Sequence, residues 1–447
     1  MKIFFSIVAC FLSLQMVAQK VTLIDESPLT DEGLYFAGKK GVDYHFGKQI
    51  TPHGNCIDVI NGYVFVTWYK GGMEHRNLMV SRKKVDGNTW KTIEFPYKHV
   101  GFRGDPTKGD SHNRAAISIC PINNTVHIVY DLHAYRKKQL PNRYFSYLVS
   151  KDNAAFGEQW DLSIFNENRT YLKKGDNYER LTYPEFNRFD DGRIMLDVRF
   201  GGSGNGNDLC AIYDGKTWSS FFKYNNGNQE MKYNFYGSFQ FLFGKLYQGA
   251  CIRYMKANRD DNFKYDLNSG LYFAVANPPF GTEDWNDING KTVQIPIQNP
   301  DVIKVAEPCD INPKNNRISD MKWTVSKAGD VHYFTKVGDT PVHYYKKSNG
   351  TKFEYSTDCP YIKGDVFSHG KSIISVALEK GRPVIKSTKA GTNDWSLLYK
   401  QTTGGTYRHC VVFQEGDKIF LYAMKKGKTN SKSQPISLLT FKISSTE

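Results

Sequence analysis

The chain has 447 residues, a formal net charge of +14 and eight cysteines. It is long enough for two or three domains, but no Pro/Ser-rich linker or block of charge divides it, which favours one continuous fold. No CxxC pair occurs, which excludes a zinc ribbon and a thioredoxin-like redox motif. The basic balance is typical of a protein that meets a polyanion, although charge for solubility alone is the simpler alternative.

The N-terminal residues have the pattern of a secretory signal peptide. Lys2 is followed by an apolar run, residues 3–14, that is too short to span a bilayer, and Ala18 offers a cleavage site. We therefore predict that residues 1–18 are removed and that residues 19–447 form one exported, monomeric domain, in the periplasm or the medium. Since no later segment is apolar enough, no membrane span is expected, and export argues against nucleic acid as a partner.

From residue 19 onward, the sequence repeats one strand–turn–strand unit. Apolar and polar residues alternate at period two, and paired strand patterns recur from "CIDVINGYVFVTWYK" to "CVVFQEGDKIFLYAMK". Turns rich in Gly, Asn and Asp end in an aromatic residue that can pack between neighbouring sheets: Trp90, Trp160, Trp218, Trp285, Phe353 and Trp395. This repetition predicts an all-β fold, a seven-bladed β-propeller of four-stranded antiparallel blades.

The two ends of the mature chain are predicted to close the ring. The C-terminal segment "PISLLTFKI" and the segment after the signal, "KVTLIDE", both have strand patterns, so they can complete one blade together. The aromatic turns resemble the Asp-box, or BNR, repeats of sialidase-like propellers. That resemblance extends over residues 19–447 and implies a fold, but it says little about chemistry.

Histidine, tyrosine and arginine occur at matching places in two adjacent units. Propellers bind ligands where the inner strands and their loops converge, so polar residues just before a first strand or just after a second strand are candidates. His112 and His133 hold these places in one unit, and Tyr183 and Arg199 hold them in the next. We predict that these four side chains share one site, whereas the mid-strand His127 is predicted to be structural.

These residue types fit a β-elimination on a uronic acid. Glycoside hydrolysis normally needs two carboxylic acids, which we cannot pair at this face, and no G-x-S-x-G nucleophile elbow occurs. Elimination needs a cation to neutralise the carboxylate, a base for the proton on carbon 5 and an acid for the departing oxygen on carbon 4. Arg199 fits the first task. His112 and Tyr183 fit the proton transfers, with a nearby arginine expected to lower the pKa of Tyr183.

The same stretch resembles a known enzyme family. The run "SHNRAAISICPINNTVHIVYDLHAY", followed by "TYPEFNRFDDGRIMLDVRFGG", is similar to the ulvan lyases of polysaccharide lyase family 25 and their relatives in family 24. The resemblance implies cleavage of ulvan, an anionic sulfated polysaccharide, between sulfated rhamnose and glucuronate or iduronate. It implies that His112 and Tyr183 are proton donor and acceptor, in an order left open. It also implies that Arg199 neutralises the carboxylate and that His133 supports substrate or base.

Further expectations concern other residues. Tyr247 is predicted to contact substrate, with simple packing as the alternative. Arg114 is predicted to bind sulfate or carboxylate, with a surface salt bridge as the alternative. The resemblance implies a structural metal in some members, so three residues of one unit are candidate zinc ligands, with buried core residues as the alternative: His332, His343 and Cys359. The elimination itself needs no added cofactor, because Arg199 supplies the charge.

Two other functions stay open from the sequence. Exo-acting rhamnosidases of glycoside hydrolase family 145 resemble this architecture and use one histidine on the opposite face of the first blade. The stretch "QITPHGNC" places His53 just before the first strand of the first unit, and a pocket at His53 would favour that reaction. Alternatively, a basic face with aromatic residues could bind an acidic glycan without catalysis. The combination of His112, Tyr183 and Arg199 favours the lyase over both.

Overall fold

A computed structural model describes most of the chain. The described residues are 19–38, 45–46, 48–72, 74–202, 206–227, 233–254, 267–308, 311, 317–360, 364–426 and 433–445. The predicted signal peptide, residues 1–18, lies outside them. Within these ranges the helices are two short 3-10 segments, η1 (Leu162–Ile164) and η2 (Pro300–Ile303). No helix in the described part of the chain is long and apolar enough to cross a membrane.

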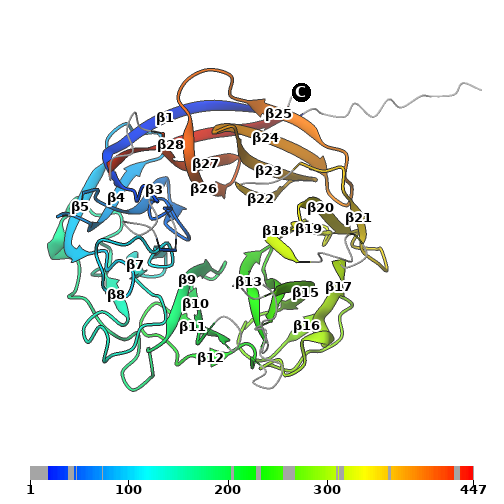
Figure 1. The fold of residues 1–447 in the computed structure, drawn as a ribbon, viewed down its shortest axis with the longest axis horizontal. Helices are drawn as coiled ribbons and strands as arrows, with labels where there is room; N and C mark the ends of the chain where they lie inside the picture. The colour runs from blue at the N-terminus through cyan, green and yellow to red at the C-terminus, as the bar shows by residue number, and fades with distance from the viewer. Residues whose placement is uncertain are drawn as a thin grey trace, which may run out of the picture.

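Seven antiparallel sheets form a closed ring around a central opening (Figure 1), which confirms the predicted seven-bladed propeller. Blade 1 contains β2 (Ile57–Ile60), β3 (Tyr63–Tyr69), β4 (Asn77–Lys84) and β5 (Lys91–Lys98). Blade 2 contains β6 (Ala115–Cys120), β7 (Thr125–Tyr130) and β8 (Ser146–Val149). Blade 3 contains β9 (Leu181–Arg188), β10 (Ile194–Phe200), β11 (Asn207–Tyr213) and β12 (Phe222–Lys223). Blade 4 contains β13 (Tyr233–Leu242), β14 (Lys245–Tyr254), β15 (Leu267–Ala276), β16 (Trp285–Asp287) and β17 (Lys304–Ala306). Blade 5 contains β18 (Ile318–Val325), β19 (Val331–Val337), β20 (Thr340–Lys346) and β21 (Glu354–Ser356). Blade 6 contains β22 (Gly364–His369), β23 (Ser372–Glu379), β24 (Arg382–Lys389) and β25 (Ser396–Lys400). Blade 7 contains β26 (Tyr407–Glu415), β27 (Lys418–Lys425), β28 (Ser433–Ser445) and β1 (Gln19–Leu34).

The ends of the described chain close the ring as predicted. β1 runs antiparallel to β28, from the pair Gln19 and Ser445 to the pair Leu34 and Ser433. In Figure 1 the blue strand β1 lies beside the red strand β28 at the outer edge of blade 7. Seven blades are therefore held in a ring by one strand pair whose members come from opposite ends of the sequence.

Blade 2 departs from the four-stranded pattern. Its sheet contains only β6, β7 and β8 among the described residues. The place of a fourth strand is taken by an irregular segment that makes two isolated bridges, Ser150 to Phe165 and Tyr147 to Arg169. The segment begins with η1, where the Asp161 side chain accepts a hydrogen bond from the Ser163 backbone and so favours a helical turn over a strand.

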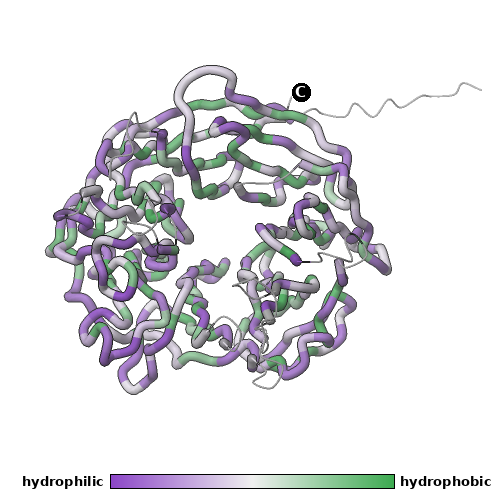
Figure 2. Tube along the Cα trace, in the orientation of Figure 1, coloured by the Kyte–Doolittle hydropathy of each residue, from purple (hydrophilic) through white to green (hydrophobic). Residues whose placement is uncertain are grey.

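The aromatic turn residues pack against the preceding blade, which confirms the role predicted for them. Trp218 of blade 3 donates a hydrogen bond from Nε1 to the hydroxyl of Tyr147 in blade 2, at 3.0 Å. Trp90 of blade 1 does the same with Ser27 of β1, also at 3.0 Å. Since each blade is covered by its neighbours on both faces, inner strands such as β7 are buried along their whole length. Figure 2 shows the result, with hydrophobic residues in the strands and hydrophilic ones in most turns.

Candidate active site

The structure brings the four predicted site residues together at one end of blades 2 and 3. His112 lies in the loop before β6 and His133 in the loop after β7. Tyr183 is in β9 and Arg199 is near the end of β10. The loop of His133 is tied to β9 by an isolated bridge from His133 to Thr182. The loop that follows β7 in blade 2 thus meets the start of β9 in blade 3.

The aromatic rings of this group are stacked. The rings of His112 and His133 are parallel to within 3°, with centroids 3.9 Å apart. The ring of Tyr183 follows at 5.2 Å from that of His112, and the guanidinium of Arg199 lies over Tyr183 at 4.5 Å from its centroid. Phe46 makes a T-shaped contact with each of the two histidine rings. The side chains predicted to transfer protons and to neutralise charge are therefore in mutual contact.

A β-bulge orients Tyr183. The register of β9 on β10 shifts between Asp197 and Arg199, so that Tyr183 and Pro184 lie opposite Val198 alone. Tyr183 has a φ of 57°, in the left-handed region that bulky residues avoid. A backbone of this kind costs on the order of 1–3 kcal/mol and is found mainly at functional sites. In a regular strand, successive side chains point to opposite faces of the sheet. The bulge breaks this alternation and turns the phenol of Tyr183 toward His112 and Arg199.

Asp110 belongs to the cluster and was missed by the sequence reasoning. Its carboxylate is fully buried. One oxygen lies 2.8 Å from Nδ1 of His112, and the other lies 2.5 Å from Nδ1 of His133. The signal was present in "GDSHNR", because an acid two residues before a histidine can turn back onto it. The partnership with His133, across the β6–β7 hairpin, has no local signal.

Three arginines and two tyrosines alternate in a ladder that runs from this cluster into blade 4. The guanidinium of Arg199 lies 4.6 Å from the ring centroid of Tyr236 as well as 4.5 Å from that of Tyr183. Arg253 also lies 4.6 Å from the centroid of Tyr236, and Arg114 lies 5.3 Å from that of Tyr183. Nε and Nη1 of Arg199 are buried and have no hydrogen-bond partner among the described residues. They are free to bind an anion such as a carboxylate.

The surroundings shift the pKa values of His112, Asp110 and Tyr183. Burial lowers the pKa of His112, partly opposed by its hydrogen bond to Asp110. Burial would raise the pKa of Asp110, but the hydrogen bonds from the two histidines hold it well below its usual range. The pKa of Tyr183 is raised, because burial outweighs the opposing charge of Arg199. This corrects the expectation that the arginine would make Tyr183 more acidic.

Two predicted substrate contacts are placed differently. Tyr247 lies near the start of β14, buried against Phe273 at 5.8 Å between ring centroids. It lies at the strand end away from Arg253, in the packed position that was the alternative for this residue, whereas Tyr236 lies beside Arg199. Arg114 is beside the cluster, but its guanidinium forms an ion pair with Glu185 at 2.8 Å, as the alternative for this residue anticipated.

The proposed zinc ligands do not gather into one centre. Nδ1 of His332 lies 2.9 Å from Nε2 of His343, and the outer nitrogens are occupied by the Gly391 backbone and the Asn393 side chain. The pair thus forms a hydrogen-bonded chain between blades 5 and 6. Within the described ranges, Cys359 does not join it to form a group of three possible ligands. The group that does have all its ligand atoms within 4.8 Å is Asp110, His112 and His133. There the two Nδ1 atoms already hydrogen-bond to the carboxylate.

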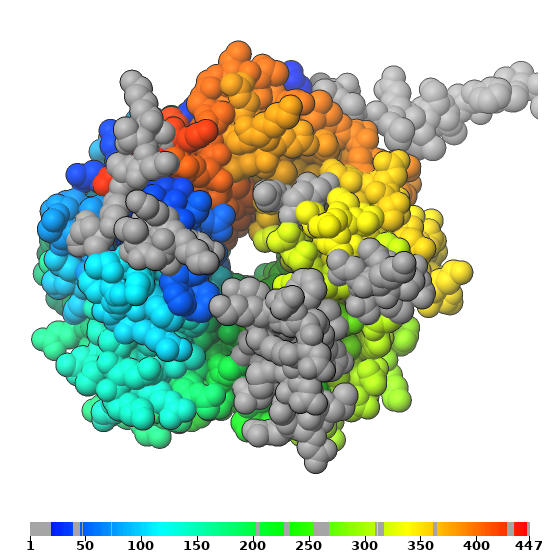
Figure 3. Space-filling view, viewed as in Figure 1, coloured from blue at the N-terminus to red at the C-terminus, as the bar shows by residue number. Residues whose placement is uncertain are grey.

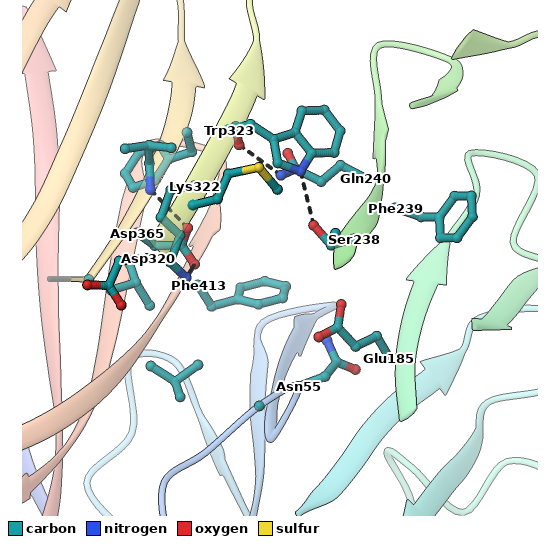
Figure 4. A pocket seen from close by; sticks show the side chains of 18 of the residues that line it. Asn55, Glu185, Ser238, Phe239, Gln240, Asp320, Lys322, Trp323, Asp365 and Phe413 are labelled. Carbon is teal, nitrogen blue, oxygen red and sulfur yellow. Dashed lines mark hydrogen bonds and ion pairs between the residues drawn. The ribbon is translucent and has the colours of Figure 1, made fainter. Parts of the chain in front are cut away.

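A cavity of about 720 Å³ occupies the central channel beside the cluster. The opening is visible in the space-filling view (Figure 3), and Figure 4 shows how first strands of several blades line it. Arg114, Glu185 and Tyr236 line the cavity and connect it to the ladder. His53 also faces this cavity, and burial lowers its pKa to about 3. On the wall of the cavity formed by blades 5 and 6, Lys322 pairs with Asp365 at 3.8 Å (Figure 4).

Comparisons with known proteins place the chain in a family. Residues 63–358 match the model of the BNR repeat-containing family. The chain is 33% identical to the long and the short ulvan lyase isoforms of Alteromonas sp. (strain LOR), over 94% and 92% of its length. The match covers 88% of the short isoform but 47% of the long one. The chain thus spans about half the length of the long-isoform relatives.

Solved structures agree with the sequence matches. The crystal structure of polysaccharide lyase Uly1 superposes with a TM-score of 0.86 at 27% identity, covering 95% of this chain and 100% of that one. A family 25 ulvan lyase bound to -[GlcA(1-4)Rha3S]- superposes with a TM-score of 0.66 at 11% identity, over 92% and 95% of the two chains. The second match shows the shared fold alone. The chain belongs to the BNR repeat-containing family and, within it, to the ulvan lyases.

Proposed function

We propose that this protein is a polysaccharide lyase that cleaves ulvan by β-elimination, at a glucuronate or iduronate next to sulfated rhamnose. The product end would carry a 4,5-unsaturated uronate. The observation that carries the proposal is the contact of His112, Tyr183 and Arg199 in one cluster. The 33% identity to curated ulvan lyases over nearly the whole chain supports the choice of substrate.

Arg199 would neutralise the uronate carboxylate. Its side chain is 8% exposed, and two of its nitrogens lack hydrogen bonds within the described chain. A buried guanidinium stays charged and can hold a carboxylate through two parallel hydrogen bonds. Withdrawal of charge from the carboxylate stabilises the enolate that forms when carbon 5 loses its proton.

His112 would be the base and Tyr183 the acid. Burial lowers the pKa of His112, so its imidazole is neutral near pH 7 and can accept the proton from carbon 5. Burial raises the pKa of Tyr183, so its phenol keeps its proton until the reaction needs it. The electron pair of the broken C5–H bond forms the C4=C5 double bond, the C4–O bond breaks, and the departing oxygen takes the proton of Tyr183. His133 supports this arrangement through its stack on His112.

The wider setting follows from the composition. The net charge of +14 fits an anionic polysaccharide as substrate. Because Arg199 supplies the positive charge, we propose that the elimination requires no added cofactor. We further propose that the protein is exported through residues 1–18, to the periplasm or the medium, and acts there as a monomer.

Ultraviolet absorbance during incubation with ulvan tests the proposal. Elimination creates a double bond conjugated to a carboxylate, which absorbs, and hydrolysis does not. We expect rising absorbance with the mature protein and loss of at least about 100-fold in turnover for His112→Ala and Tyr183→Phe. His75→Ala and Tyr355→Phe are matched controls, because both side chains are exposed and far from the cluster in sequence. A flat trace, or unchanged rates in the first two variants, would contradict the proposal.

A further inference from the structure

The strongest unassigned feature is the carboxylate of Asp110. It is fully buried and accepts hydrogen bonds on both oxygens from side chains that lie in different loops. Oδ1 is 2.8 Å from Nδ1 of His112 and 3.0 Å from the His112 backbone nitrogen. Oδ2 is 2.5 Å from Nδ1 of His133. The Asp110 backbone carbonyl also accepts from the Asn113 backbone at 3.1 Å, which fixes the short loop.

The partners determine where each histidine carries its proton. An ionised carboxylate can only accept hydrogen bonds, so the atom facing it must donate. In both rings that atom is Nδ1. A neutral imidazole has one N–H, so the other nitrogen, Nε2, must hold a lone pair. The rings are parallel to within 3° and 3.9 Å apart, so the two lone pairs lie in nearly parallel planes, on ring atoms that do not face Asp110.

We propose that Asp110 is a positioning residue that locks His112 and His133 together in the Nδ1–H tautomer, so that both present a basic Nε2 to the uronate. The identity of the substrate, a uronate, rests on the proposed function. The two tautomers do not, because they follow from the hydrogen bonds to Asp110. Without the carboxylate, His112 could rotate about its side-chain bonds or carry its proton on Nε2, where it could not accept one. Phe46, whose ring centroid lies 5.1 Å from that of His112 and 5.2 Å from that of His133, packs against both rings and limits their rotation.

The wild-type protein provides the first test. Nitrogen NMR of histidine-labelled protein distinguishes the two tautomers, and His112→Gln and His133→Gln assign the two signals. We expect both histidines to carry their proton on Nδ1 at pH 8. A proton on Nε2 of either residue would overturn the proposal, and this measurement does not depend on any variant at Asp110 folding. It also does not depend on activity: inactivity toward ulvan with both tautomers as expected would refute the proposed function alone.

Asp110→Asn provides the second test. A side-chain amide has one accepting oxygen and one donating nitrogen, so it can satisfy one histidine as before but must donate to the other. That ring is forced to carry its proton on Nε2. We expect kcat to fall by on the order of 100-fold or more, as when a tautomer is set wrongly, with KM within about threefold. The NMR spectrum should show one histidine switched.

Asp105→Asn is the matched control. Asp105 lies in the same loop, and its side chain is 38% exposed. Its Oδ1 accepts hydrogen bonds from the backbone nitrogen of Thr107 at 2.9 Å and from the Thr107 hydroxyl at 2.6 Å. We expect this variant to keep the wild-type kcat and both tautomers. If Asp110→Asn lowers thermal stability but keeps kcat and both Nδ1–H signals, then Asp110 is only structural and the proposal fails.

Discussion

At the scale of single residues, the site depends on how Arg199 is held. Its guanidinium lies against two aromatic rings that are nearly perpendicular to each other, 4.5 Å from the centroid of Tyr183 and 4.6 Å from that of Tyr236. The flat face of a guanidinium can stack on an aromatic ring while its edge donates hydrogen bonds. A compact ammonium group can replace the charge but neither the stack nor the paired hydrogen bonds. The identity of the cation should therefore matter as much as its sign.

Arg199→Lys should lower kcat/KM on ulvan by about 100- to 1,000-fold, although the charge is kept, because one set of preorganised donors to the carboxylate is lost. Steady-state rates from ultraviolet absorbance measure the loss. Arg193→Lys is the matched control, since Arg193 precedes the same strand and pairs on the surface with Asp191 at 2.8 Å. Equal rates for Arg199→Lys and the wild type would show that any cation near the carboxylate suffices.

The sequence predicts some of these residues and not others, for a physical reason. His112, His133, Tyr183 and Arg199 could be predicted because each occupies a repeated place in its blade, and the repeat itself encodes the geometry. Asp110 could not, because its bond to His133 depends on how two loops fold toward each other. Sharing a blade also does not by itself bring His332, His343 and Cys359 together as metal ligands, and within the described ranges they do not form such a group. The place in the repeat predicts which end of a strand a residue occupies, but not its partners.

At the scale of elements, the pair of β1 and β28 is the only strand pairing in the described structure that joins the two ends of the chain. Every other blade is built from consecutive strands and can form locally. Separation of this one pair would break the link between the two ends of the chain and let the packed faces of blades 7 and 1 move apart. The closing blade is therefore expected to limit thermal stability.

A disulfide between Thr22→Cys and Lys442→Cys should raise the free energy of unfolding by about 2–4 kcal/mol. The two positions are direct partners on adjacent antiparallel strands, and both side chains are exposed. Their Cβ atoms are thus close enough to bridge. Thermal unfolding with and without reductant measures the gain. The control pair, Lys20→Cys with Lys442→Cys, is two residues out of register and should not cross-link. A cross-link with no change in melting temperature would mean that unfolding starts at another blade.

At the scale of the whole molecule, packing between blades buries histidines that the reaction does not use. His127 contacts Tyr147 and Trp218 between blades 2 and 3, and His343 contacts Trp395 between blades 5 and 6. Burial lowers the pKa of His127 to about 3 and that of His343 to about 4. Burial lowers the pKa of His409 to about 4 as well. These groups link the stability of the ring to pH, because they must be uncharged in the folded state.

Their effect has a definite sign. A histidine in the unfolded chain takes up a proton below about pH 6.5, whereas these buried histidines do not until the pH falls to about 3 or 4. Between those limits the unfolded chain binds more protons, so stability is complete above pH 6.5 and falls toward pH 4. Three carboxyl groups act in the opposite direction, because burial raises the pKa of Asp208 to about 7 and also raises the pKa values of Asp197 and Glu415. The buried histidines with lowered pKa values outnumber them, so net loss of stability on acidification is expected.

His127→Gln isolates one of these groups. The variant loses one titrating group whatever its effect on stability at pH 8, so the slope of unfolding free energy against pH, between pH 6 and 4.5, should fall by about 1.4 kcal/mol per pH unit. Urea unfolding at several pH values measures the slope, and the exposed His75→Gln should leave it unchanged. Because the slope counts protons, a cavity or a lost hydrogen bond at position 127 shifts the whole curve without tilting it. An unchanged slope in His127→Gln would show that this imidazole is already protonated inside the fold, with both ring nitrogens donating hydrogen bonds, one to Thr125 and one to Tyr147.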